Sequence, residues 1–325
     1  MAEKWNIGKL SERLSTEADA YVLMEQMRWG DTPFCPHCHS ERVYFLNPQN
    51  GENRKTRTGS ASQRRVWACG ECRKQFSVLT GTVFHGTKIS LRKWLFVIFE
   101  MCASKNGVAA REIERKYGVT NKTAWFMLHR IREAMKAEPL SMMMSGTVVA
   151  DETFIGGSFK NKHKSQERKY SAGRSGGPYD KTPVLSLINT ETGEVRSQVL
   201  DRVDGANLRK AIAEQVDLPN TTLLTDKGAS YNVVAREMRA HHTVDHKADE
   251  YVRHVGEIVV TTNHAEGYFS QLKRSIDGTH HHVSVAHLPR YLAEFDFRYT
   301  TRKMDDSARM DRLMDQVAGR RLTYR

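Results

Sequence analysis

The spacing of apolar residues changes character along the chain. From residue 1 to about 30 the spacing is helical, with Leu10 and Leu14 one turn apart. A longer helical pattern runs from Leu91 to about Lys136. From about residue 145 onwards, apolar residues gather instead in short runs rich in Val, Ile and Thr, which are typical of strands. The pattern therefore predicts a largely helical first half and a second half that contains a sheet.

The second half combines strands with helices. Strands are expected at Thr147–Ile155, Pro183–Ile188, Val195–Leu200, Thr221–Thr225, His242–Asp245 and Glu257–Val260. Helices are expected at about 204–217, 229–240, 262–276 and 285–298. The sequence "NTETGE" predicts a turn, so the second and third strands should form a hairpin. Strands that come first as a group and then alternate with helices indicate a mixed-sheet α/β domain.

One segment of the second half differs in composition. The stretch "GGSFKNKHKSQERKYSAGRSGGPYDK" is rich in Gly, Lys and Ser and poor in apolar residues. Such a segment cannot bury enough apolar surface to order itself. We therefore expect a mobile insertion at residues 156–182.

Four of the five cysteines form two C-x-x-C pairs. Cys35 and Cys38 lie in "FCPHCHS", and Cys69 and Cys72 lie in "WACGECRKQF". Each tight turn points two thiolates at one ion, and four thiolates leave no open coordination position. The spacing therefore predicts a zinc ribbon that holds one structural Zn²⁺.

The remaining candidate ligands and the fifth cysteine have simpler interpretations. His37 and His39 are alternative zinc ligands, but a complete set of thiolates exists without them. Cys102 lies in the helical apolar run "LFVIFEMCA", which indicates a core residue.

The charge balance indicates the class of partner. The chain has 50 Lys and Arg residues against 38 Asp and Glu residues, a formal charge of +12. This excess favours an anionic partner, of which nucleic acid is the commonest. The N-terminus lacks the apolar core of a signal peptide, and no run is long enough to span a membrane. We therefore expect a cytoplasmic protein with no membrane partner, in which disulfides are rare.

A candidate DNA-binding motif follows the cysteine pairs. The stretch "NGVAAREIERKYGVTNKTAWFMLHRIREAM" contains two amphipathic helical segments that meet at Gly118, and Asn121 can cap the second. This pattern predicts a helix-turn-helix, with an ordinary helical hairpin as the alternative. The side chains expected to face a DNA groove are Asn121, Lys122, Thr123, Phe126 and Arg130. The zinc ribbon upstream and the positive charge favour DNA binding.

Acidic residues follow the predicted strands. In "GTVVADETFIGG" a buried strand reaches two adjacent acids, Asp151 and Glu152, which are costly at the edge of a core unless something neutralises them. Asp226 follows another apolar strand in "TTLLTDKGASY". In the predicted helix of "TTNHAEGYFSQLKRSIDG", Glu266 and Lys273 share one face. We therefore expect Asp151, Asp226 and Glu266 to converge.

Three carboxylates from two strand ends and one helix match what a pair of divalent cations requires. Mg²⁺ prefers a few carboxylates together with water and phosphate oxygens. Two such ions can activate an attacking oxygen and stabilise the leaving oxygen during displacement at phosphorus. The sequence therefore predicts a site for two Mg²⁺ or Mn²⁺ ions, with Lys273 near enough to pair with a phosphate of DNA.

The order of these motifs resembles a known family. "VVADETFIGG", "LLTDKG" and "TNHAEGYFSQLKRSIDGTHHHVSVAHLPRYLAEFDFRY" are similar to the catalytic domain of certain bacterial insertion-sequence transposases. These transposases carry a zinc ribbon and are related to the eukaryotic Merlin elements. "CPHC", "CGEC", "FSVLTGTVFHGTKISLRKW" and the helix-turn-helix resemble the N-terminal half of the same family. The resemblance covers roughly residues 20 to 300.

The resemblance implies a ribonuclease-H-like core with a DDE-type acid triad. It also implies dependence on divalent metal, with cleavage and strand transfer at the terminal inverted repeats of the element. On this sequence the triad would be Asp151, Asp226 and Glu266, with Lys273 as the associated lysine.

Two positions of the triad have an alternative residue. Some relatives have asparagine at the third position, which makes Asn263 the alternative to Glu266. Glu266 is preferred because a negative ligand holds a metal better and because it shares its helical face with Lys273. Glu152 is the alternative to Asp151.

The expected protein is a DNA transposase of the bacterial cytoplasm, associated with the nucleoid, whose partners are the terminal inverted repeats and target DNA. Because two ends must be joined, we expect a homo-oligomer of at least two subunits on DNA. A non-catalytic DNA-binding regulator and a structure-specific nuclease with the same core are the alternatives. The expected domains are an N-terminal helical segment (1–33), the zinc ribbon (34–85), the helix-turn-helix domain (86–140), the catalytic domain (145–303) and a basic C-terminal tail (304–325).

Overall fold

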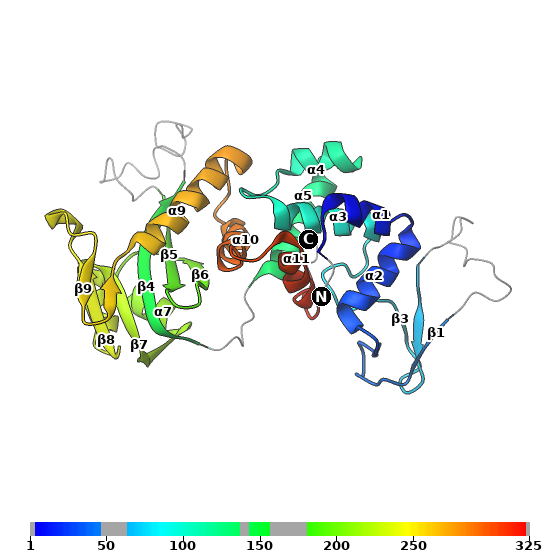
Figure 1. Ribbon diagram of the computed structural model, residues 1–325, viewed down its shortest axis with the longest axis horizontal. Helices are drawn as coiled ribbons and strands as arrows, with labels where there is room; N and C mark the ends of the chain where they lie inside the picture. Colours follow the sequence, from blue (N-terminus) through cyan, green and yellow to red (C-terminus); the bar gives the residue numbers. More distant parts are fainter. Residues whose placement is uncertain (1–3, 47–63, 137–142, 157–180, 323–325) are drawn as a thin grey trace. The chain divides into compact units, whose positions relative to one another are not determined.

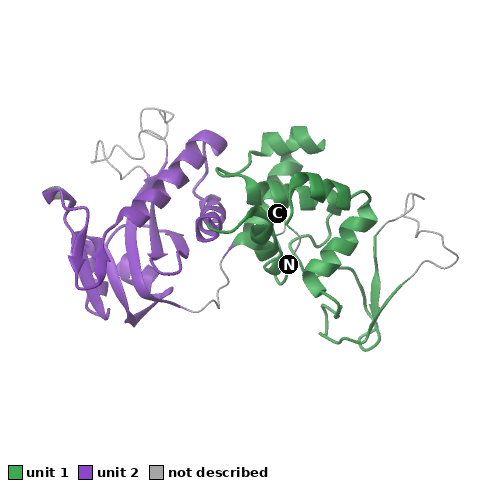
Figure 2. Cartoon of the chain, viewed as in Figure 1, with its two compact units in different colours: residues 1–135, 303–325 green, residues 136–302 purple. Residues whose placement is uncertain are grey.

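The computed structural model describes residues 4–46, 64–136, 143–156 and 181–322. The chain divides into two compact units, which Figure 2 shows in different colours. Residues 1–135 and 303–325 form unit 1, and residues 136–302 form unit 2. Most of the expected insertion at 156–182 lies outside the described residues.

Unit 2 is built on one five-stranded sheet. Its strands are β4 (Met144–Ile155), β5 (Thr182–Asn189), β6 (Val195–Val199), β7 (Val216–Asp226) and β8 (Ala240–Val244). They lie in the order β6-β5-β4-β7-β8, with β4 in the centre. The β4–β5 and β5–β6 pairs are antiparallel, and the β4–β7 and β7–β8 pairs are parallel. This mixed order is the ribonuclease-H-like arrangement that the resemblance implies.

Helices cover both faces of this sheet (Figure 1). On one face, α9 (Asn263–Ser275) and α10 (Leu288–Thr300) bury residues such as Phe269 and Leu292 in a cluster that includes Val149 of β4. On the other face, Leu208 of α7 (Gly205–Ala213) packs in a second cluster. Both faces of β4 are therefore buried, which explains the nearly continuous apolar run in the central strand.

Shorter elements connect β7 to α9. A 3₁₀ turn (Ala229–Tyr231) and the four-residue α8 (Asn232–Ala235) precede β8. After β8 come a 3₁₀ turn (His246–Ala248) and a two-stranded hairpin of β9 (Arg253–Val255) and β10 (Ile258–Val260). The helix expected at 229–240 is thus mostly absent. Gly228 and the return of the chain to the sheet edge at Ala240 leave little room for it.

Unit 1 begins with two helices that support the zinc ribbon. Helix α1 (Ile7–Arg13) is followed by α2 (Glu17–Trp29), whose first turn has a capping box between Thr16 and Asp19. The ribbon consists of the three short strands β1 (Val43–Phe45), β2 (Trp67–Cys69) and β3 (Gln75–Phe76). Its loop at 47–63 lies outside the described residues.

The helix-turn-helix follows a third helix. Helix α3 (Leu91–Ala103) precedes α4 (Ala110–Tyr117) and α5 (Asn121–Met135). Gly118 ends α4 with a left-handed conformation (φ 59°), which glycine adopts at little cost. The cap of α5 differs from the expectation, because the Oγ1 atom of Thr120 accepts the Thr123 N–H at 3.3 Å. Thr120 therefore precedes the helix as its cap, and Asn121 is the first helical residue.

The C-terminal segment differs from the expected basic tail. Residues Asp306–Asp315 form α11, which packs against α2 and α3 of unit 1. Met310 and Leu313 have no exposed surface, and Met314 is nearly as buried. The pattern of Met310, Leu313 and Met314 is helical (i, i+3, i+4), so the segment has an apolar face that a count of its charges conceals.

Replacing Leu313 with alanine should destabilise unit 1. The side chain is fully buried, and comparable Leu→Ala changes cost about 2–5 kcal/mol because they leave a cavity. The neighbouring Arg312 is exposed, so Arg312→Ala should change stability by less than about 0.5 kcal/mol. Urea unfolding of the full chain measures both. Equal stabilities for the two variants would mean that α11 does not belong to the core of unit 1.

No helix in the described ranges is long and apolar enough to cross a bilayer.

Candidate active site and zinc site

The sheet register places Asp151 and Asp226 beside each other. Strands β4 and β7 run parallel with Val149 opposite Leu224, and each acid follows two residues later on its strand. Because side chains alternate along a strand, Asp151 shares the face of Val149, and Asp226 shares the face of Leu224. Val149 and Leu224 both belong to the cluster beneath α9. The two acids therefore lie on neighbouring strands at the edge of the core that α9 covers.

Helix α9 adds the third acid. Its buried residues include Ala265 and Phe269, which anchor the helix on the sheet, and the helix packs against β4 and β5. Glu266 follows Ala265 and keeps 53% of its side chain exposed. The pKa of Asp151 is raised to about 6, first by burial and then by the negative charges of Asp226 and Glu266. The structure thus brings the other two predicted acids, Asp226 and Glu266, within electrostatic reach of Asp151.

Asp226 is held by the turn that follows it. The backbone N–H of Gly228 donates to Asp226 Oδ1 at 2.9 Å. A Cβ atom at position 228 would come within 2.9 Å of the same oxygen, which is closer than real Cβ contacts allow. Glycine at position 228 therefore lets the chain turn tightly enough to fix the carboxylate of Asp226.

Glu152 points to the other side of the sheet. It lies opposite Leu185 of β5, and Leu185 belongs to the cluster on the far face together with Tyr231. The pKa of Glu152 is raised to about 7, mainly by burial and also by the charges of Asp151 and Asp226, against the opposing effect of the Tyr231 hydroxyl. Because of this orientation, Asp151 and not Glu152 faces α9 and Glu266.

Within the described part of the chain, no Lys or Arg forms an ion pair with Asp151, Asp226 or Glu266. Their charges are therefore left to repel one another, and a divalent cation would relieve that repulsion. The donors are carboxylate oxygens, which Mg²⁺ and Mn²⁺ prefer. The residues present therefore fit such ions.

One residue at this site was not predicted. His246 lies just beyond the end of β8, and its Nε2 atom is 2.8 Å from Thr262 Oγ1 and 3.8 Å from Glu266 Oε1. It also acts on the pKa of Asp151, which places it beside the same acids. The position of His246 just after a predicted strand could have indicated it, because groups at the carboxyl ends of neighbouring parallel strands tend to meet. This position is harder to notice than that of an acid directly after an apolar run.

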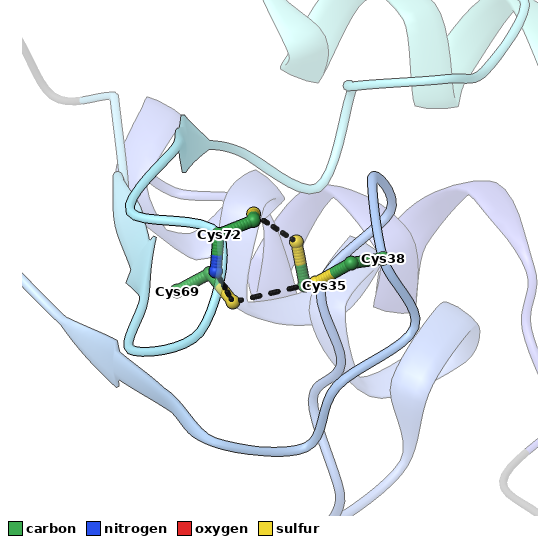
Figure 3. A group of neighbouring side chains, drawn as sticks. All are labelled: Cys35, Cys38, Cys69 and Cys72. Atoms are coloured by element: carbon green, nitrogen blue, oxygen red, sulfur yellow. Dashed lines mark hydrogen bonds between the residues drawn. The ribbon is translucent and has the colours of Figure 1, made fainter.

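The second predicted site is the cluster of four cysteines (Figure 3). Its Sγ atoms are 3.6 Å apart for Cys35–Cys72 and for Cys38–Cys69. Tetrahedral Zn²⁺ with Zn–S bonds of about 2.3 Å requires sulfurs about 3.8 Å apart, which these distances nearly match. The Cys72 N–H donates to Cys69 Sγ at 3.4 Å, and this hydrogen bond is the main cause that lowers the pKa of Cys69 to about 7. The cluster is a structural zinc site.

The cysteine cluster is complete without the two histidines. Among the residues that the structure describes, these four cysteines are the one group of three or more Cys, His, Asp or Glu side chains with all ligand atoms within 4.8 Å of one another. His39 instead stacks on Phe34, with ring centroids 6.2 Å apart.

Buried contacts fix the ribbon on α2. Glu25 accepts from Arg65 Nε at 2.8 Å and from Trp67 Nε1 at 2.9 Å. The Trp29 ring contacts Trp67 and Phe76 edge to face, each at a centroid distance of 5.9 Å. The ribbon strands are only two or three residues long, so zinc and this aromatic cluster supply most of what holds them together.

Two regions of the chain match transposase domains. Residues 143–300 match the ISXO2-like transposase domain, and residues 15–75 match a transposase zinc-ribbon domain. The chain belongs to the insertion-sequence transposases that carry these two domains. The zinc-ribbon match begins at residue 15, which agrees with the close packing of the ribbon on α2.

Individual relatives agree with this assignment. The transposase is 26% identical over 288 residues to "Uncharacterized protein in transposable element ISH50" from Halobacterium salinarum. The aligned region covers 87% of this chain and 90% of that protein. A second likeness is to a chain in a structure of the simian T-cell lymphotropic virus intasome with PP2A regulatory subunit B56 gamma, with 15% identity and a TM-score of 0.28. The match covers 63% of this chain and 65% of that chain. The second likeness is too weak to add to what the strand order shows.

The predicted DNA-contacting residues of the transposase divide into two groups. At the start of α5, Lys122 is exposed, while Asn121 and Thr123 are partly exposed. Arg130 is only 5% exposed, and its guanidinium donates to the His85 carbonyl at 2.6 Å and lies over the Trp94 ring. Arg130 therefore joins α5 to the segment after the ribbon and is not placed to reach a base edge.

The remaining predicted residues lie on α9. Lys273 is exposed and lines a cavity of about 220 Å³ together with Lys181 and His281. It is seven residues, or about 10 Å, beyond Glu266 along the helix. Asn263 is exposed at the first position of α9, and its N–H donates to Thr261 Oγ1 at 3.2 Å.

Proposed function

We propose that this transposase cleaves DNA at the ends of an insertion sequence and joins the freed ends to target DNA. One observation carries the proposal: Asp151 and Asp226 lie on the same face of the neighbouring strands β4 and β7, and Glu266 lies on α9, which covers that face, and acts on the pKa of Asp151. In this proposal they hold two Mg²⁺ or Mn²⁺ ions. When bound, such ions activate an attacking oxygen and stabilise the leaving oxygen of a phosphodiester.

The three acids would contribute differently. Asp151 is largely buried and rigidly placed by the sheet, and the Gly228 N–H fixes Asp226. Glu266 is half exposed on a helix, so it can adjust as DNA enters.

Two further side chains, Lys273 and His246, would assist the acids. We expect Lys273 to bind a phosphate of the DNA strand that lies along α9. His246 would hold Glu266 in place, because its imidazole bridges the space between Thr262 and the Glu266 carboxylate. The first reaction is hydrolysis of the phosphodiester at an element end, and the freed 3′-hydroxyl then attacks the target strand.

The choice of Glu266 over Asn263 can be tested directly. Glu266→Gln keeps the shape of the side chain but removes its charge, and should lower cleavage and strand transfer by about 10²-fold or more, as expected for loss of electrostatic stabilisation. Asn263→Ala should lower them less than about tenfold, because a neutral amide holds a divalent cation less tightly than a carboxylate does. Products from a supercoiled donor that carries the element ends are quantified with Mg²⁺, Mn²⁺ or chelator. The reverse ranking of the two variants would transfer the role to Asn263.

The same assay separates the proposed function from its alternatives. Joined products define a transposase, and hydrolysed ends without joining define a structure-specific nuclease. If neither product formed with either metal while the protein bound the element ends, the protein would be a non-catalytic DNA-binding regulator.

The partners in this proposal are the terminal inverted repeats and target DNA. The zinc ribbon and the exposed start of α5 at Lys122 would position the repeats. Because two ends are joined, we propose an assembly of at least two subunits on DNA. Because the proposed substrate is element DNA, we propose that the protein works in the bacterial cytoplasm, at the nucleoid.

A further inference from the structure

A two-stranded hairpin precedes the helix that carries Glu266. Its strands β9 and β10 are antiparallel, with Val255 opposite Ile258, and both of these side chains pack against the core cluster beneath α9. Strand β10 also contacts β8 (Figure 1). It ends at Val260, and α9 begins at Asn263. The hairpin is therefore fixed to the part of unit 2 where α9 begins.

Tyr251 connects this hairpin to the acids. It lies two residues before β9, and its ring contacts the His246 ring with a centroid distance of 5.4 Å. The Nε2 atom of His246 is in turn 2.8 Å from Thr262 Oγ1 and 3.8 Å from Glu266 Oε1. A single imidazole ring thus separates the Tyr251 ring from the Glu266 carboxylate.

Tyr251 remains exposed despite this contact. Its exposed fraction is 51%, and the fractions for Val252 and Val259 of the same hairpin are 47% and 48%. Single exposed apolar side chains are ordinary on a protein surface. Three on one short hairpin, next to a group of acids, form an apolar surface that a ligand would cover.

The sequence of the hairpin favours an apolar contact over a phosphate contact. From His246 to Val259 there are two Lys or Arg residues against three Asp or Glu residues. Glu250, directly before Tyr251, accepts from the Asp245 N–H at 3.1 Å and lies 3.9 Å from Arg253 Nε. Because the acids offset the cations, the part of DNA that suits this surface is the flat face of a base, which stacks on aromatic rings.

Only certain bases have a face to offer. Inside a duplex each base is stacked on its neighbours, and unstacking it costs free energy. A base at a strand end has one free face at no such cost. Hydrolysis at an element end, which is the first step of the proposed function, creates a terminal base next to the freed 3′-hydroxyl. That hydroxyl must stay at the metal ions for the joining step.

We propose that the Tyr251 ring stacks on the terminal base of the cleaved strand and thereby holds the freed 3′-hydroxyl at the metal ions. This inference rests on the proposed function and deepens it, because it assigns to Tyr251 the task of keeping the cut end in place. Every base has a π-face, so the contact should tolerate any terminal base and should need the ring of Tyr251 but not its hydroxyl.

The test measures joining of labelled, pre-cleaved element ends to a target plasmid by the full-length zinc-loaded protein with Mg²⁺. Tyr251→Ala should lower joining about five- to a hundredfold, the range for one lost stack between a base and an aromatic ring. Tyr251→Phe is the matched control, because it keeps the ring, and it should join within about threefold of the wild type.

A second substrate lacks only the terminal base of the cleaved strand. The wild type should join this abasic end as slowly as Tyr251→Ala joins the intact end. Tyr251→Ala should lose nothing further on the abasic end, because the two changes remove the same contact. Circular dichroism and thermal melting of each variant ensure that folded proteins are compared.

Each other outcome overturns the inference. Equal joining of the intact end by the wild type and Tyr251→Ala would do so while the proposed function stands. An equal loss in Tyr251→Ala on intact and abasic ends would show that the ring only supports His246. A loss in Tyr251→Phe as large as that in Tyr251→Ala would show that the ring is not the group that matters. If the folded wild type joins neither end, the proposed function falls together with the inference.

Discussion

Asp151→Asn should abolish DNA cleavage and strand transfer while the protein stays folded. Bound metal ions stabilise transition-state charge by several kcal/mol, and each 1.4 kcal/mol is a factor of ten in rate, so we expect a loss of about 10³-fold or more. The change keeps the size of the side chain and removes a charge that burial and two neighbouring acids make costly. The thermal stability of the metal-free variant should therefore equal or exceed that of the wild type.

Glu152→Gln is the matched control for this prediction. The two acids are adjacent in sequence, both are largely buried, and each substitution removes one negative charge. They point to opposite faces of the sheet, and only Asp151 faces α9. We expect Glu152→Gln to keep activity within about tenfold of the wild type. The assay is joining of labelled element ends to a target plasmid, and loss of joining in Glu152→Gln with retention in Asp151→Asn would exchange the roles of the two acids.

Cys69→Ser should remove zinc and unfold the ribbon. The apparent free energy of structural zinc binding is about 10–16 kcal/mol in small zinc domains, and the ribbon strands are too short to persist without it. Cys69 is buried, and the backbone N–H of Cys72 stabilises its thiolate. We therefore expect loss of the bound zinc, together with proteolysis of the ribbon between its two knuckles.

Cys102→Ala is the control for the zinc prediction. Cys102 is also a buried cysteine of unit 1, but it lies on α3 outside the cluster. The variant should keep the zinc content of the wild type as measured by atomic absorption. Chelation of the wild type should reproduce the proteolysis pattern of Cys69→Ser. A Cys69→Ser protein that retained full zinc content and protease resistance would show that the ribbon has another ligand.

Much of the fold could be predicted because burial patterns are local. The apolar run before Asp151 marks the central strand, and the run before Asp226 marks its parallel neighbour. The stripe of Ala265, Phe269 and Leu272 marks α9 as a helix that lies on the sheet. Asp226 ends its strand, whereas Asp151 lies within the longer β4, so the approach of the two acids depends on β4 and β7 being parallel neighbours, which a local pattern does not determine. The C-x-x-C spacing, by contrast, defines four thiolates without knowledge of the rest of the chain.

Other features depend on contacts between distant residues. Arg130 lies on the side of α5 expected to face DNA, and only the packing of His85 and Trp94 shows that it is buried. The residues after 303 look like a charged tail until α2 and α3 are present to receive Met310 and Leu313. His246 carries no motif of its own, and its role depends on where Thr262 and Glu266 lie in space. Tertiary packing overrides local composition in each case.

The central claim is that Asp151, Asp226 and Glu266 form one cation site, and the most direct measurement is anomalous X-ray diffraction from crystals of the full-length protein grown with Mn²⁺. The account predicts anomalous peaks about 2.1 Å from carboxylate oxygens of these three acids, with none at Glu152. Crystals of the Asp151→Asn variant grown in the same way should lack those peaks and keep the zinc signal at the four cysteines. Peaks at Glu152, or Mn²⁺ bound only outside the three acids, would contradict the account.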